Sequence, residues 1–82
     1  MPIHKRYDLV RLLLDGHFHG YRRRVREKGL ALETDELWHD LMEAALEADR
    51  EWPGDTGLEW EQAILRRVEA RLATLWLPPI VG

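Results

Sequence analysis

Apolar side chains recur along the first third of the chain at the spacing of an amphipathic helix. Gaps of four, four, three and four residues separate Val10, Leu14, Phe18, Tyr21 and Val25. The stripe continues through Gly16 and Gly20, so it predicts one long first helix. Each glycine weakens a helix interior by about 1 kcal/mol relative to alanine. A break at residues 16–20, which would give two shorter helices, is therefore the alternative. Gly29 is expected to end the element in either case, because glycine readily takes the left-handed conformation that follows a helix.

Two further apolar stripes predict two further helices. Their members are Leu37, Leu41, Ala45, Ala48 and Trp52, followed by Trp60, Ile64, Val68, Leu72 and Leu75. Thr34 is the expected N-cap of the second helix, and Pro53 is expected to stop that helix. Thr56 and Glu59 have the form of a capping box at the start of the third helix. Pro78 and Pro79 prevent that helix from extending beyond residue 77.

These elements predict an all-α fold, a small three-helix bundle that forms a single domain over residues 1–82. The sequence contains no strand-like alternation of useful length and no internal repeat. Residues 77–81 form a tail that is too apolar to extend freely into water. We expect the tail to dock on the bundle or on a partner.

Composition limits how the fold can be stabilised and indicates the cellular location of the protein. The chain has 82 residues and no cysteine, so neither disulfides nor cysteine zinc sites supplement its core. Its apolar runs are far shorter than the roughly 20 residues that span a bilayer, and no leader pattern is recognisable at the start. We therefore expect a cytoplasmic protein that does not enter a membrane. The frequent use of Arg, Leu, Glu and Ala indicates a GC-rich bacterial or phage origin.

Charge is distributed unevenly along the chain. Residues 1–29 carry a net charge of +5 and residues 30–82 a net charge of −8, which together give the overall −3. The basic segment contains one cluster, which comprises Arg22, Arg23, Arg24, Arg26 and Lys28. Arginines beside aromatic rings suit phosphate contact and base stacking, so nucleic-acid binding is one hypothesis. The alternative is a basic face that is solvated or paired with acids of the same domain. Acids at the starts of the other two helices disfavour a helix-turn-helix reading.

Three histidines raise a weaker metal hypothesis. His17 and His19 flank Phe18 between two glycines, and His39 follows in the second helix. Side chains two residues apart share a side in a turn, where two imidazoles can chelate a metal, but they diverge on a helix. The hypothesis therefore depends on whether the first helix breaks, and no second metal-binding motif accompanies these residues.

Aromatic residues carry the interaction hypothesis. Four tryptophans are many for this length, and Trp52 and Trp60 flank one loop, where they are expected to pack on each other or close the end of the bundle. Trp38 lies off the main stripe of its helix. Gly16 and Gly20 present a smooth surface that suits either a helix crossing or a kink. Surplus apolar surface predicts a protein interface; its candidate residues are Phe18, Tyr21, Trp38, Trp76 and Ile80. The alternative is that all four indoles are core anchors of a monomer.

Catalysis has little support in the sequence. The chain contains no cysteine and no serine, and no glycine-rich loop precedes a helix in phosphate-binding form. The sequence thus predicts a non-catalytic protein–protein interaction module, a small accessory subunit or regulator, with homodimerisation as its simplest form. Neither a cofactor nor a small-molecule substrate is predicted.

Overall fold

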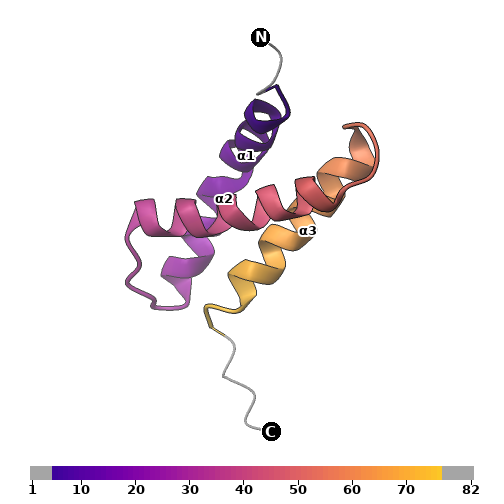
Figure 1. Ribbon diagram of the computed structural model, residues 1–82. Coiled ribbons are helices and arrows are strands. Elements are labelled where there is room, and N and C mark those ends of the chain that lie inside the picture. Colours follow the sequence, from indigo (N-terminus) through magenta and orange to yellow (C-terminus); the bar gives the residue numbers. More distant parts are fainter. Residues whose placement is uncertain (1–4, 77–82) are drawn as a thin grey trace, which may run out of the picture.

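The computed structural model describes residues 5–76, which form three α-helices and contain no strand (Figure 1). These helices are α1 (Lys5–Glu27), α2 (Thr34–Glu51) and α3 (Leu58–Ala73). The all-α, three-helix prediction is confirmed. No helix of the described part is long and apolar enough to cross a bilayer. Ile80 and the expected docking of the apolar tail lie outside the described residues.

Helix α1 is continuous through Gly16 and Gly20, so the first helix is not split. The apolar stripe on both sides of the glycines explains why. Val10 and Leu14 before them, and Tyr21 and Val25 after them, are all at least 96% buried in one core. Packing at both ends of α1 outweighs the local cost of two glycines in a helix.

The end of α1 follows the expected glycine motif. Gly29 has φ 75°, its N–H donates to the Arg26 carbonyl at 2.9 Å, and the Leu30 N–H donates to the Val25 carbonyl at 3.2 Å. This pair of bonds is a Schellman motif, which satisfies carbonyls that the last helical turn leaves open. The predicted end of the first helix is confirmed.

The two expected threonine caps were wrong by one residue each. Glu33 is the N-cap of α2, because its carbonyl accepts the first helical bond from the Leu37 N–H at 3.0 Å. Gly57 is the N-cap of α3, and its carbonyl accepts from the Glu61 N–H at 2.9 Å. Neither helix start has a side-chain cap. Acids in each first turn instead supply the negative charge that the helix dipole favours there.

Helix α2 organises the bundle because it packs on both other helices, whereas α1 and α3 touch each other least. Figure 1 shows α2 crossing α1 and α3 on one side. Ala44 and Ala45 are completely buried, and their small side chains let the neighbouring helices approach closely. Among the described residues, no helix covers Leu12, Gly16 and Gly20 of α1, which are exposed.

One end of the bundle is closed by an aromatic and ionic cluster. Asp49 Oδ1 of α2 accepts from Arg6 Nε at 2.9 Å, Arg6 Nη2 at 2.7 Å and Trp60 Nε1 at 2.9 Å. This carboxylate therefore links all three helices. Nearby, Trp52 Nε1 donates to the Asp55 carbonyl at 2.9 Å and holds the loop between α2 and α3.

Candidate interaction surface

Among the predicted interface residues that the structure describes, Phe18, Trp38 and Trp76 are partly buried against the core and Tyr21 is fully buried. Phe18 and Trp38 contact each other edge to face, with ring centroids 5.1 Å apart, and both are partly buried against the core. This pair joins α1 to α2. Trp76 is also partly buried, and Lys28 Nζ lies 5.4 Å from its ring centroid. Most of this aromatic surface is thus used within the chain.

Tyr21 belongs to the core, which corrects its assignment to an interface. Its side chain is 2% exposed, because the same stripe that predicts α1 turns it inward. The hydroxyl has no hydrogen-bond partner among the described residues. Burial raises the pKa of Tyr21, the charge of Glu69 raises it further, and Arg24 opposes both effects. Tyr21 is therefore a neutral, buried phenol.

The three candidate histidines do not form a metal-binding group in the described part of the chain. Because α1 does not break, His17 and His19 diverge from each other on a helix, and both are exposed. His17 stacks on Tyr21 with ring centroids 6.2 Å apart, and His39 is exposed on α2. Within residues 5–76, no group of three or more His, Asp or Glu side chains could hold a metal ion.

The basic cluster divides into a paired part and an open part. Arg24 lies over the Tyr21 ring, with Cζ 5.4 Å from the centroid, and its Nη2 is 3.9 Å from Glu69. Arg22, Arg23 and Arg26 have no carboxylate within 4 Å in the described part of the chain. Arg22 and Arg26 line an open hollow of about 220 Å³ beside the start of α2.

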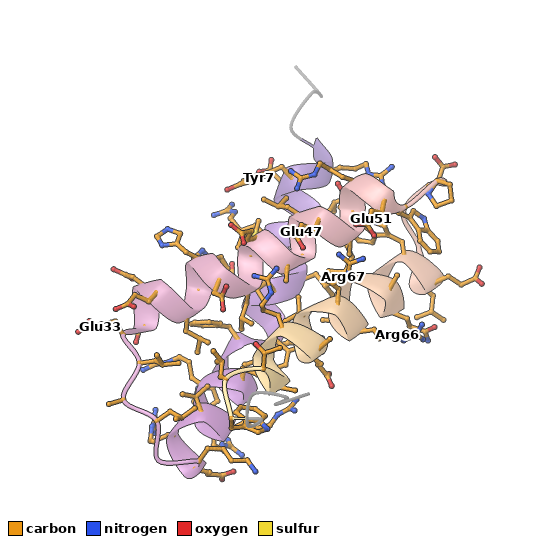
Figure 2. All side chains as sticks on the ribbon, turned by 60° about the horizontal axis from the view of Figure 1, so that its bottom comes forward. Tyr7, Glu33, Glu47, Glu51, Arg66 and Arg67 are labelled. Carbon is orange, nitrogen blue, oxygen red and sulfur yellow. The ribbon has the colours of Figure 1, made fainter. Side chains whose placement is uncertain are left out.

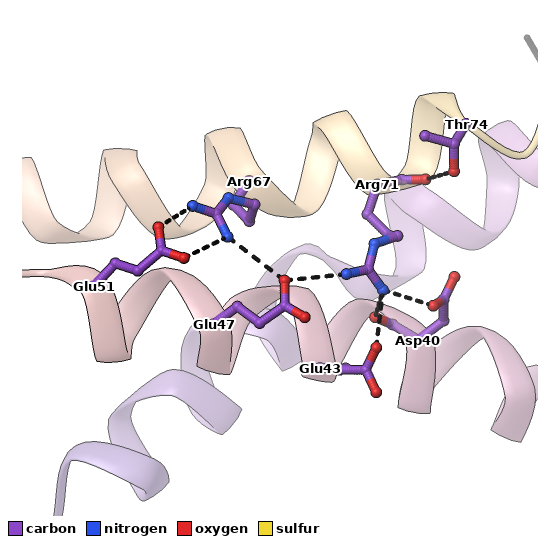
Figure 3. Close-up of polar contacts among 7 residues, drawn as sticks. All are labelled: Asp40, Glu43, Glu47, Glu51, Arg67, Arg71 and Thr74. Carbon is purple, nitrogen blue, oxygen red and sulfur yellow. Dashed lines mark hydrogen bonds and ion pairs between the residues drawn. The ribbon is translucent and has the colours of Figure 1, made fainter.

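Two arginines of α3 form ion pairs with a row of four acids on α2 (Figure 3). Arg71 Nη1 donates to Asp40 at 2.9 Å and to Glu43 at 3.3 Å, and its Nη2 donates to Glu47 at 3.2 Å. Arg67 pairs with Glu51 and lies 3.5 Å from Glu47. Figure 2 shows Arg67 on the side of α3 that faces α2, with Arg66 on the outer side.

These ion pairs stabilise the charged forms of their members. The hydrogen bond from Arg67, and then the charge of Arg67, lower the pKa of Glu51 below its ordinary value. The hydrogen bond that Arg71 donates to Asp40 is the first cause of the raised pKa of Arg71. Two arginines therefore link α3 to four acids of α2, and residues 30–82 remain net negative.

A partly open apolar surface lies on α1. We call this surface the outer face of α1; it comprises Leu9, Leu12, Leu13, Gly16 and Gly20. Leu12 is 59% exposed, and a Cβ built on Gly16 or on Gly20 would meet nothing within 4 Å. Among residues 5–76, the glycines therefore do not mark a helix crossing. Leu9 and Leu13 lie at its margin, partly buried against the core.

Sequence reasoning singled out the two glycines but missed the leucines. A signal was present, since Leu9, Leu13, Gly16 and Gly20 are spaced by four, three and four residues. This second stripe runs beside the core stripe of the same helix.

The comparisons with known proteins add no guidance: no family model, curated protein or solved structure matches the chain.

Proposed function

We propose that the chain is a small, non-catalytic protein-interaction module that binds through the outer face of α1. The observation that carries the proposal is Leu12, a large apolar side chain that is 59% exposed beside two open glycines. A large apolar side chain in water gains free energy when a partner covers it. The glycines let that partner approach the helix backbone closely.

The remaining polar groups support a binding role over a catalytic one. Arg67 and Arg71 form ion pairs with four acids of α2, so these four carboxylates are not free for acid–base chemistry. The cytoplasm is the setting we propose, because a fold without cysteine needs no oxidising compartment.

Site-specific photo-crosslinking in the cells that produce the protein tests this function. A photoreactive amino acid in place of Leu12 is expected to give a protein adduct. The same amino acid in place of Leu58, which is 70% exposed on α3, is expected to give none. Leu58 is a matched control because it is an exposed leucine outside the outer face of α1. Equal adduct formation at the two positions, or no adduct at residue 12, would contradict the proposed function.

Nucleic-acid binding is a second candidate, favoured by the open part of the basic cluster. Arg22, Arg23 and Arg26 leave the last turns of α1 on one side, without carboxylate partners among residues 5–76. Each guanidinium that contacts a phosphate releases counterions, which makes binding depend on salt.

Binding of a labelled DNA duplex and a labelled single-stranded RNA, followed by fluorescence anisotropy in rising salt, tests this candidate. Three phosphate contacts predict that the logarithm of the binding constant falls with a slope of roughly −2 to −3 against the logarithm of salt concentration. Arg23→Glu is expected to make the slope shallower by about 1. Arg66→Glu, an exposed arginine of α3, is the control. Binding that ignores salt, or an equal effect of both variants, would remove this candidate.

A further inference from the structure

The open hollow beside the start of α2 combines an apolar floor with a basic rim. We call it the arginine hollow; its volume is about 220 Å³. The floor contains Val25 and Leu37, each 4% exposed, and the rim contains Arg22 and Arg26 of α1. Residues 30–32, which connect α1 to α2, complete one wall. Pockets that enclose drug-sized ligands have about 300–1,000 Å³, so this hollow suits a smaller ligand.

The two arginines of the rim are available to a ligand. Arg22 and Arg26 are four residues apart, so they project from the same side of α1. Neither has a carboxylate within 4 Å among residues 5–76, whereas four other arginines of that range do have one. Arg26 lies in the last turn, where the helix dipole favours a basic residue in any case. Arg22 lies one turn earlier and is not explained in that way.

No acidic side chain belongs to the lining of the arginine hollow in the described part of the chain. Thr34 is the only other polar residue of the lining. Glu33 and Asp35, its neighbours in sequence, are exposed and lie outside the lining, so water and salt screen their charges. Glu36 lines a different hollow, together with Leu75. The chemistry of the arginine hollow is therefore that of an anion site with an apolar floor.

We propose that the arginine hollow binds a small-molecule phosphate monoester that carries an apolar or aromatic group. A phosphate monoester has a charge of about −1.5 to −2 at pH 7 and three strong acceptor oxygens. It therefore matches two guanidiniums in charge, and both can pair with it at once. A carboxylate has one charge and two oxygens, which suit a single arginine. The attached group gains free energy by covering the apolar floor.

This inference goes beyond the proposed function and does not rest on it. The outer face of α1 contributes no residue to the lining of the arginine hollow. Photo-crosslinking at residue 12 consequently reports on a different surface. The two proposals can fail separately, because an adduct at residue 12 says nothing about a phosphate in the hollow.

Titration of the full-length chain with phenyl phosphate, followed by NMR of the backbone amides, tests the site. The largest shifts are expected in residues 22–26 and 30–37, which contain the lining. Inorganic phosphate lacks the apolar group and phenol lacks the phosphate, so each should bind at least about fivefold more weakly. Largest shifts outside these ranges, or equal affinity for phenyl phosphate and inorganic phosphate, would overturn the inference.

Two substitutions separate the shape of the hollow from its charge. Ala31→Phe fills the hollow and keeps its charge; Ala31 is an exposed residue of the lining, so unchanged helical circular dichroism is expected. Arg22→Gln removes one charged donor. Each variant should weaken phenyl phosphate binding about tenfold. Arg66→Gln, at an exposed position of α3, is the matched control. An equal loss in Arg22→Gln and Arg66→Gln would show that net charge attracts the ligand, and would refute the site.

Arg23 distinguishes this site from nucleic-acid binding by the same helix. Arg23 is exposed and does not line the hollow, so Arg23→Gln should change phenyl phosphate binding by less than about twofold. A loss as large as that of Arg22→Gln would assign the phosphate to the basic cluster as a whole and refute the hollow.

A short peptide with a phosphotyrosine at its centre distinguishes a small molecule from a modified protein. It carries the same phenyl phosphate group on a polypeptide. We expect it to bind no more tightly than phenyl phosphate, because the lining provides for that group alone. A gain of more than about tenfold would assign the phosphate to a partner protein, and would overturn the small-molecule ligand.

Discussion

Replacing Asp49 by alanine is expected to lower the free energy of unfolding by about 2–3 kcal/mol, because it leaves three N–H donors of two side chains in the closed end of the bundle without their acceptor. Oδ1 of this residue accepts from Arg6 and from Trp60, and its side chain is only 16% exposed. Trp60 is 3% exposed, so water cannot readily replace the lost acceptor for its N–H. The loss is large for a domain whose total stability is of order 5–10 kcal/mol. Urea unfolding followed by circular dichroism measures it.

A double-mutant cycle separates the Asp49–Trp60 hydrogen bond from the other effects of the substitution. Trp60→Phe removes the indole N–H and keeps an aromatic ring in the core, so the cycle isolates that bond. We expect the effect of Asp49→Ala to be smaller in the Trp60→Phe background, with a coupling of about 1 kcal/mol. Asp55→Ala is the control, because Asp55 uses its backbone carbonyl and not its carboxylate to bind Trp52. Equal destabilisation by the two alanine variants would show that Asp49 does not link the helices.

The helices of this fold could be predicted from apolar spacing, and the reason is visible in the core. Val10, Leu14, Leu41, Ile64 and Val68 all come from the three predicted stripes, and all are at most 1% exposed. Gly29 was likewise predictable, since few residues take the left-handed conformation that ends α1. The stripe also predicted a continuous α1, but it left a break at residues 16–20 open, because local preference disfavours glycine inside a helix and the packing at both ends of α1 that outweighs this cost is a tertiary feature.

Features that depend on how the helices are arranged could not be predicted. The link from Arg6 to Asp49 joins residues 43 positions apart, and nothing in their local sequence marks them as partners. Tyr21 was assigned to an interface although its own stripe places it in the core. Whether the two histidines of α1 could bind one metal ion depended wholly on whether that helix breaks.

The outer face of α1 could not be predicted from the sequence either. The helix carries two apolar stripes, and sequence alone does not say which one α2 and α3 cover. The core stripe contains larger and more numerous apolar residues, so it is the stronger of the two signals in the sequence. Leu12 became a candidate only when its exposure was known.

Enlarging Ala45 to leucine is expected to lower the free energy of unfolding by about 2–3 kcal/mol, the largest effect we expect for a change that only adds atoms. Ala45 is completely buried at the centre of α2, the helix that packs on both of the others. Three added carbon atoms must therefore push α1 or α3 away from α2, which opens contacts that the core now makes. Thermal and urea unfolding of the variant provide the measurement.

Ala70→Leu on α3 is the matched control for this substitution. Ala70 is exposed, and leucine is nearly as good a helix former as alanine, so its stability should change by less than about 0.5 kcal/mol. A similar loss in both variants would mean that helix propensity, and not close packing of α2, sets the cost. A tolerated leucine at residue 45 would show that α2 lies farther from its neighbours than the buried alanines indicate. In that case the placement of α1, and with it the exposure of its outer face, would need to be revised.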